Sequence, residues 1–160
     1  PWVVTRAALE PFRVSTPERD VPLLPYLAEP RPLSYDIHLE VHMRPNGASE
    51  RTRLARTNYR HLYYSAAQQL AHHAIGGCLI QTGDLLGSGT ISGDSPEEYG
   101  SLLEMSWGAE RPLELPGGVQ RTFVEDGDEM VLTGWAEGDG YKVGFGECSG
   151  TILPSPSFRG

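Results

Sequence analysis

Cysteine, positive charge and long apolar runs are all scarce in this sequence of 160 residues. The only cysteines are Cys78 and Cys148, and no apolar run approaches the roughly 20 residues that a membrane helix needs. The opening residues show no charged region, apolar core and cleavage site in succession, so we expect no secretory signal. Two thiols in such a chain predict reduced, packed side chains in a cytoplasmic protein rather than a disulfide.

The scarcity of positive charge excludes two classes of partner. The chain has 13 Lys and Arg residues against 21 Asp and Glu residues, which gives a net charge of −8. A surface of this sign repels phosphate backbones and anionic lipid headgroups. We therefore expect neither nucleic acid nor a membrane surface as a partner.

Glycine and proline, in contrast, are abundant. The 19 glycines and 13 prolines favour short strands joined by many turns over a helical bundle. Prolines are dense between Ala8 and Pro32, which predicts an irregular surface connection. Trp2-Val3-Val4 follows Pro1 and has the composition of a strand. We therefore expect the sequence to start inside a domain and to be a fragment of a longer protein.

Hydrophobic periodicity predicts the main elements. Residues Tyr35 to Met43 alternate between apolar and polar and end at the turn Pro45-Asn46-Gly47, which predicts a half-buried strand. One helix is predicted from about Asn58, a suitable N-cap, to Ala74, with Gly76-Gly77 as its end. Further strands are predicted at residues 79–80, 85–88, 102–107, 122–124, 130–135 and 141–145. The fold class is therefore mainly β with one long helix.

Two groups of side chains resemble metal ligands. The polar face of the first clear strand carries Asp36, His38, Glu40 and His42, and a solvated strand face accounts for them equally well. His72 and His73 are adjacent on the predicted helix and point about 100° apart, so they do not share one site easily. Interaction of at least one of them with the helix C-terminus is the simpler role.

Several known motifs are incomplete. No helix follows the glycine clusters at residues 138–140 and 144–146, so turns are a better interpretation than a dinucleotide-binding loop. Asp126-Gly127-Asp128-Glu129 lacks the length of a calcium loop and is interpreted as a turn that opens a strand. Neither Ser88 nor Ser92 lies in a Gly-x-Ser-x-Gly motif, so no serine nucleophile is predicted.

Two residues are better candidates for a site. Thr90 lies in a glycine-flanked turn, where its hydroxyl can approach a ligand closely. Glu104 interrupts the apolar pattern of the strand predicted at residues 102–107. A carboxylate there lies either at an exposed edge or partly buried beside a partner. On the pattern alone, a structural role is open for both residues.

Taken together, segments spread over residues 2–154 resemble the fumarylacetoacetate hydrolase superfamily. The resemblance rests on the order and spacing of short motifs. These motifs are Trp2-Val3-Val4, Ala8-Leu9-Glu10-Pro11-Phe12, Leu24-Pro25-Tyr26-Leu27, Gln68-Gln69-Leu70 with His72-His73, Gly83-Asp84-Leu85-Leu86, Ser88 to Gly93, Gly100-Ser101-Leu102-Leu103-Glu104 with Trp107, Asp126-Gly127-Asp128-Glu129, Gly138-Asp139-Gly140-Tyr141 and Gly144-Phe145-Gly146.

The resemblance implies hydrolysis of a carbon–carbon bond in 4-fumarylacetoacetate, giving fumarate and acetoacetate, in tyrosine and phenylalanine catabolism. It implies that Ca²⁺ or Mg²⁺ holds the diketone oxygens as a Lewis acid. A histidine that a glutamate orients would deprotonate the attacking water. By the same resemblance, the fold is the C-terminal part of a mixed β-sandwich roll, and the parent enzyme is a homodimer.

Two residues match the functional positions of that family. Glu104 matches the glutamate of the catalytic pair, and Thr90 matches the substrate-contacting threonine. The family's catalytic histidine and metal ligands would precede this sequence, so no metal ligand is expected within it. We expect residues 1–154 to be the C-terminal part of the catalytic domain, inactive alone, with a loose tail at residues 155–160.

Two alternatives remain open. A relative that acts on another acylpyruvate or β-diketone would carry the same motifs. A non-catalytic β scaffold, or the partner of a separately encoded half, would also fit the elements predicted.

Overall fold

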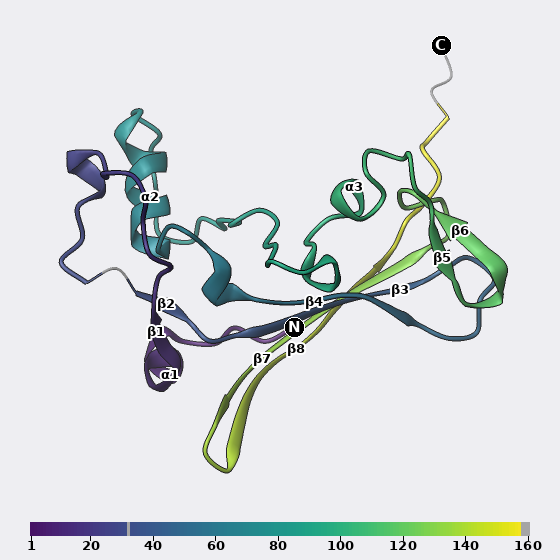
Figure 1. Ribbon diagram of the computed structural model, residues 1–160, viewed down its shortest axis with the longest axis horizontal. Helices are drawn as coiled ribbons and strands as arrows, with labels where there is room; N and C mark the ends of the chain where they lie inside the picture. The colour runs from purple at the N-terminus through teal and green to yellow at the C-terminus, as the bar shows by residue number, and fades with distance from the viewer. Residues whose placement is uncertain (32, 158–160) are drawn as a thin grey trace.

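The computed structural model describes residues 1–31 and 33–157, which form a mostly β structure (Figure 1). A four-stranded antiparallel sheet in the order β4-β3-β7-β8 is its main feature, and the pairs β1-β2 and β5-β6 form two small sheets. The strands are β1 (Arg13–Ser15), β2 (Leu33–Tyr35), β3 (His38–Arg44), β4 (Thr52–Asn58), β5 (Leu113–Leu115), β6 (Val119–Arg121), β7 (Glu129–Gly138) and β8 (Tyr141–Thr151). The helices are α1 (Arg6–Leu9), α2 (Ala66–Ile75) and α3 (Leu102–Met105), with 3-10 turns η1 (Glu10–Phe12), η2 (Pro25–Leu27), η3 (Tyr59–His61), η4 (Pro96–Glu98) and η5 (Pro116–Gly118).

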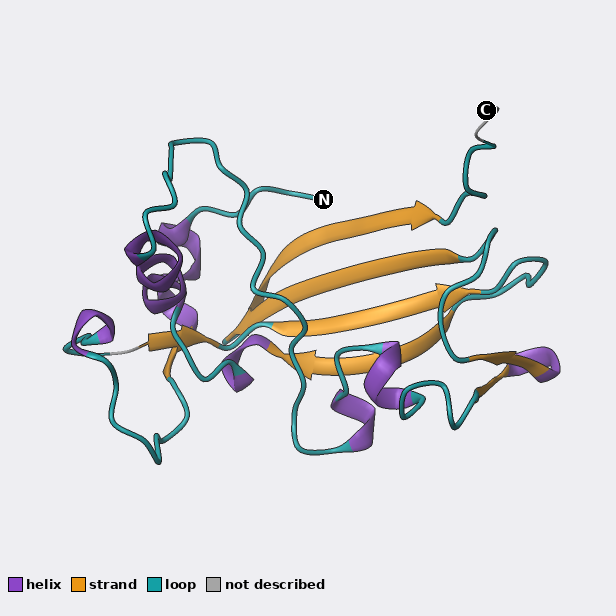
Figure 2. Cartoon of the chain, turned by 90° about the horizontal axis from the view of Figure 1, so that it is seen from above, coloured by secondary structure: helices purple, strands orange, loops and turns teal. Residues whose placement is uncertain are grey.

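Two hairpins build the main sheet, which Figure 2 shows from above. The predicted turn at Pro45-Asn46-Gly47 follows β3, and the predicted turn at Gly138-Asp139-Gly140 joins β7 to β8. Asp126-Gly127-Asp128 leads directly into β7, which confirms a strand-opening turn. These three predictions are confirmed because turn residues at fixed offsets from apolar strands determine where the chain reverses.

The turn predicted at Gly144-Phe145-Gly146 is wrong, because these residues lie inside β8. The ladder between β7 and β8 shifts register here, and Gly146 has φ +71°. A Cβ at Gly146 would lie 2.9 Å from the Trp2 ring. Glycine therefore serves a bulge and a close side-chain approach at this position, not a chain reversal.

The two faces of the main sheet differ in chemistry. On one face, Glu40 forms ion pairs with Arg53 and Arg56 of β4. The opposite face is apolar, and its best-packed part is a core of Phe12, Ile37 and Ala136. A cavity of about 400 Å³ continues this apolar face, and its lining includes Pro1, Leu39, Leu132, Phe145 and Cys148.

The predicted helix starts seven residues too early, since its N-cap is Ser65 and not Asn58. Helix α2 begins after Ser65, whose hydroxyl accepts from the Gln68 amide while the Gln68 side chain accepts from the Ser65 amide. Asn58 does act as a cap, but of the short turn η3. The reason is that Thr57 and Asn58 pair with β3, and this pairing overrides the helical spacing of the residues that follow. The end at Gly76-Gly77 is confirmed.

Most of the short strands predicted after α2 are wrong. Residues 79–80 and 85–88 are in loop conformation, residues 102–105 are helical, and β6 ends just before residue 122. Leu79 and Leu85 are 77% and 97% exposed. Within the described residues, neither segment pairs with a strand, so the two segments are not part of any sheet. The strands predicted at 130–135 and 141–145 lie within β7 and β8.

The remaining predictions are partly confirmed. The proline-rich segment holds only short elements (α1, η1, β1 and η2), while Pro32 and residues 158–160 of the predicted tail lie outside the described residues. Both cysteines are free thiols as expected, but both are exposed, so the prediction of packed side chains is wrong. Cys78 follows a helix end, and Cys148 lies on β8, which is an edge strand. No helix in the described ranges has the length and apolarity needed to cross a bilayer.

Candidate functional site

Glu104 lies on helix α3, so the strand predicted at residues 102–107 is wrong. Ser101 caps this helix, because its hydroxyl accepts from the Glu104 amide at 3.3 Å. The chain leaves the helix through Trp107, Gly108 and Ala109, all with positive φ. A serine three residues before an acidic residue is a helix-start signal, and it overrides the apolar alternation here.

The Glu104 carboxylate is exposed, but two hydroxyls hold it. Ser92 donates to Glu104 Oε2 at 2.6 Å, and Ser101 donates to the same oxygen at 3.3 Å. Among the described residues, no donor bonds Oε1. From the sequence, Glu104 was expected either at an exposed edge or partly buried beside a partner. Its carboxylate is exposed and has hydrogen-bond partners, so it combines one feature of each alternative.

Thr90 lies in the loop that leads to this carboxylate. It is exposed and follows Gly89, which has φ +77°. The next residue, Ile91, is buried, and Ser92 reaches Glu104. No direct hydrogen bond joins Thr90 to Glu104 in the described part of the chain, so the structure connects the two predicted residues through Ser92.

Close packing of Gly100 on Ile91 holds the Thr90 loop against the segment that carries Glu104. The Gly100 amide donates to Ser92 Oγ at 3.0 Å. A Cβ at Gly100 would lie 2.6 Å from the Ile91 carbonyl oxygen and 2.8 Å from the Ile91 amide nitrogen. Because backbone atoms cannot yield as a flexible side chain does, only glycine fits this position.

We expect Gly100→Ala to destabilise the fold by about 1–3 kcal/mol, since the added methyl overpacks the contact with Ile91. Urea denaturation followed by tryptophan fluorescence measures this loss. Gly87→Ala is the matched control, because its Cβ would meet nothing within 4 Å. Equal denaturation midpoints for the two variants would show that the Gly100 contact has no energetic role.

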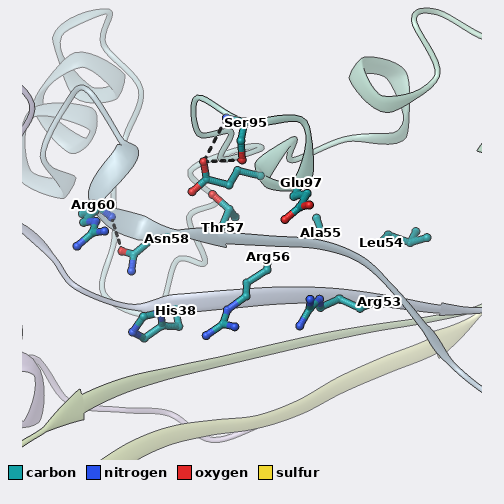
Figure 3. Close-up of a pocket in the computed structure, with 11 residues that line it drawn as sticks. His38, Arg53, Leu54, Ala55, Arg56, Thr57, Asn58, Arg60, Ser95 and Glu97 are labelled. Carbon is teal, nitrogen blue, oxygen red and sulfur yellow. Dashed lines mark hydrogen bonds between the residues drawn. The ribbon is translucent and has the colours of Figure 1, made fainter.

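A polar cavity of about 710 Å³ lies beside β4 and the turn η4 (Figure 3). Its cations are paired: Arg53 and Arg56 contact Glu40 at 3.2 and 3.7 Å, and Arg60 contacts Asp36 at 3.6 Å. These pairs leave little unbalanced positive charge to attract an anion. The cavity is therefore a structural junction between β4 and the loop that precedes Glu104.

Ser95 and Glu98 fix the turn η4 at this junction. The amide and hydroxyl of Ser95 both donate to Glu98 Oε2, at 3.2 and 3.0 Å. The hydrogen bond from the Ser95 amide lowers the pKa of the Glu98 carboxyl most, and the hydrogen bond from the Ser95 hydroxyl lowers it next. His61 also lowers this pKa. This closed turn sets the path of the chain between Thr90 and Glu104.

All five histidines of the sequence contact groups other than Glu104. His38 stacks on Trp135, His42 bonds Glu40, His61 bonds Glu98, His72 bonds Tyr26, and His73 contacts Cys78. His38, Glu40 and His42 on the polar face of β3 thus form ion pairs, hydrogen bonds or stacking contacts with other side chains. These contacts favour a structural role for the three residues over a metal site. Across residues 1–31 and 33–157, no three His, Cys, Asp or Glu side chains form a cluster suited to a metal ion.

The sequence did not indicate that Asp128 is a buried carboxylate with four hydrogen-bond donors. Asp128 is 0% exposed and accepts from Arg121 Nε and Nη2 and from the amides of Asn46 and Glu125. The bond from Arg121 is the main cause that lowers the Asp128 pKa to about 2. All four donors come from turns and strand ends around β7, so the role of this carboxylate is structural and not catalytic.

Comparison with known proteins places the sequence of this chain in a family. Residues 1–153 match the model described as Fumarylacetoacetate (FAA) hydrolase C-terminal. The chain is 51% identical over 156 residues to fumarylacetoacetase of Arabidopsis thaliana, with 98% of this chain and 37% of that protein covered. It is 46% identical to fumarylacetoacetase of Homo sapiens and 53% identical to that of Aspergillus fumigatus, with 97% of this chain and 37% and 36% of those proteins covered.

The chain belongs to the fumarylacetoacetate hydrolase C-terminal family, which confirms the resemblance stated from its motifs. It spans less than two fifths of the length of the curated relatives it matches. Most of the sequence of each of those relatives therefore has no counterpart among these 160 residues.

Proposed function

We propose that this chain forms the C-terminal part of an enzyme that hydrolyses 4-fumarylacetoacetate to fumarate and acetoacetate. The contact of 2.6 Å between Ser92 and Glu104 carries the proposal, because it brings the Thr90 loop to a carboxylate within a chain of this family. The names of the relatives support this substrate. A β-diketone of related structure is the alternative substrate.

In this proposal, Glu104 orients an imidazole that comes from outside the 160 residues. Its Oε1 accepts the N–H of one ring nitrogen, which fixes the tautomer in which the other nitrogen is free to take a proton from water. The carboxylate then stabilises the imidazolium that forms. The water oxygen bonds to a carbonyl carbon as the imidazole takes the water proton, the neighbouring carbon–carbon bond breaks, and the imidazolium returns a proton to the departing carbanion.

Thr90 is the residue of this chain proposed to contact the substrate. Its hydroxyl is exposed at a turn, follows a glycine and lies two residues from Ser92. A hydroxyl can donate to a substrate oxygen and accept from a neighbouring donor at the same time. The proposed role is therefore to hold a substrate oxygen while Glu104 acts through the imidazole.

The divalent cation implied by the family resemblance does not fit the residues of this chain. No cluster of three potential ligands occurs in the part of the chain that the structure describes. Hard cations such as Ca²⁺ require several oxygen ligands at one point. We propose that Ca²⁺ or Mg²⁺ is held by residues outside this chain, and no step above passes through it.

We extend the proposal to the parent protein in three respects. The sheet and its uncovered apolar face are suited to be the C-terminal part of a mixed β-sandwich roll, in which residues 1–154 complete a larger domain. The parent protein is proposed to be a homodimer. The two free, exposed thiols fit a reducing compartment such as the cytosol.

The test is to compare this chain with a longer protein that carries it as the C-terminal part. We expect the longer protein to consume 4-fumarylacetoacetate, measured as loss of the diketone's ultraviolet absorbance. The 160-residue chain should show no turnover, because its described residues supply neither an imidazole beside Glu104 nor a cluster of cation ligands. Turnover by the purified chain alone would contradict the proposal. A higher kcat/KM with another acylpyruvate would favour the alternative substrate.

A further inference from the structure

Ser92 makes the shortest contact to the Glu104 carboxylate. Its hydroxyl lies 2.6 Å from Oε2, within the range of a short hydrogen bond to a charged oxygen. The second contact of this oxygen, from Ser101, is 3.3 Å long. Ser101 also accepts from the Glu104 amide, so its first role is to cap α3. Ser92 is therefore the main side chain that orients the carboxylate.

The direction of the Ser92 hydroxyl is also fixed. Its oxygen accepts the Gly100 amide at 3.0 Å, and the side chain is half-buried. With that amide held on the oxygen, the hydroxyl proton is free to point at Glu104 Oε2. The Gly100 amide that donates to Ser92 is itself held in place, because Gly100 packs against the backbone of Ile91.

Both hydroxyls bond the same carboxylate oxygen, which leaves the other oxygen available. Among the described residues, Oε1 receives no hydrogen bond. A carboxylate that must accept an imidazole N–H needs one oxygen held and one oxygen open. The Ser92 contact produces this arrangement before any imidazole is present.

We propose that Ser92 is a positioning residue that holds Glu104 ready to orient the catalytic imidazole. This inference rests on the proposed function, since it assigns a role within the same site. Ser92 touches neither the substrate nor the reacting water; it acts only through Glu104. It also links the carboxylate to the Thr90 loop, so that the two functional side chains keep their relative position.

The test is a set of variants in the longer protein that carries this chain. We expect Ser92→Ala to lower kcat by about 10- to 100-fold, as loss of an outer hydrogen bond to a catalytic group does. KM should change little, because the contact does not bind substrate. Ser92→Thr should restore most of the kcat, because it keeps the hydroxyl. Ser88→Ala is the control, since that exposed hydroxyl bonds, among the described residues, only the neighbouring Gly89 carbonyl.

A double-mutant cycle separates positioning from folding. If Ser92 acts through Glu104, Ser92→Ala should have almost no further effect on kcat in a Glu104→Gln background. Urea denaturation midpoints verify that each variant is folded at the assay temperature. An unchanged kcat in Ser92→Ala, or an equal loss in both backgrounds, would overturn the inference while leaving the proposed function intact. Absence of turnover by the unmodified longer protein would instead remove the proposed function, and this inference with it.

Discussion

Glu104→Gln in the longer protein is expected to lower kcat for 4-fumarylacetoacetate by about 100- to 1,000-fold, because Glu104 orients the imidazole base, and general-base catalysis contributes about 100- to 10,000-fold. Glutamine has nearly the same shape and still offers an oxygen to Ser92. Its amide NH₂ would then face the imidazole N–H, so that two donors meet and the required tautomer loses its partner. KM should stay nearly constant, because the interaction belongs to the transition state.

Steady-state kinetics of the Glu104→Gln and Glu110→Gln variants measure this effect. Glu110→Gln is the control, because Glu110 is an exposed glutamate of the same segment and the substitution changes the net charge equally. Circular dichroism verifies that α3 and the sheet persist in both variants. A Glu104→Gln enzyme with unchanged kcat would remove Glu104 from the mechanism.

Asp128→Asn is expected to have the largest effect on stability, a loss of about 3 kcal/mol or more, because it removes the buried charge that the Arg121 guanidinium contacts most closely and leaves only the exposed Glu125 paired with it. Asp128 is fully buried and accepts from Arg121 Nε at 2.9 Å and Nη2 at 3.1 Å. The amides of Asn46 and Glu125 donate to it at 2.9 Å each. An asparagine amide group has only one acceptor atom, so its NH₂ would face two of these four donors, the pair that bonds the oxygen it replaces.

The same carboxylate predicts how stability depends on pH. Its pKa is lowered from 3.8 to about 2 in the folded chain. The folded state therefore holds this proton less tightly than the unfolded state, and the carboxylate contributes about 2 kcal/mol at neutral pH. This contribution is complete above about pH 4 and is lost as the pH falls toward 2.

Urea denaturation at pH 7 and at pH 3 tests both statements. The free-energy difference between the wild-type chain and Asp128→Asn should shrink at the lower pH. Asp126→Asn is the control in the same turn, because Asp126 is exposed and its side chain makes no hydrogen bond among the described residues. A difference that stays constant with pH would mean that charge on Asp128 has no part in stability.

The sequence predicted those elements whose pattern and partner lie close together in the chain. The alternation before Pro45 and the turns at residues 126–128 and 138–140 gave β3 and the ends of β7 and β8. The helix boundary was wrong where β4 continues to Asn58, because pairing with β3 decides the conformation there. Patterns alone do not contain such tertiary contacts.

For the candidate site, the sequence identified the residues but not their setting. The local pattern singled out Thr90 and Glu104, and the family resemblance supplied their roles. Glu104 was expected on a strand and lies on a capped helix. Ser92 was considered only as a nucleophile, and its real contact depends on how the chain folds back between residues 93 and 100. A cue existed for Ser101, a serine three residues before a glutamate, but none existed for Ser92.

The position of β3 in the middle of the sheet has a consequence for the order of folding. β3 pairs with β4 across a short loop, but its other neighbour arrives much later: Arg44 and Glu129, which face each other, are 85 residues apart in sequence. During synthesis from the N-terminus, the hairpin of β3 and β4 is therefore made well before β7. About half of the chain must follow before β7 can pair with the free edge of β3. Such long-range pairing raises contact order and slows folding, so this chain should fold slowly for its size and depend on the arrival of β7.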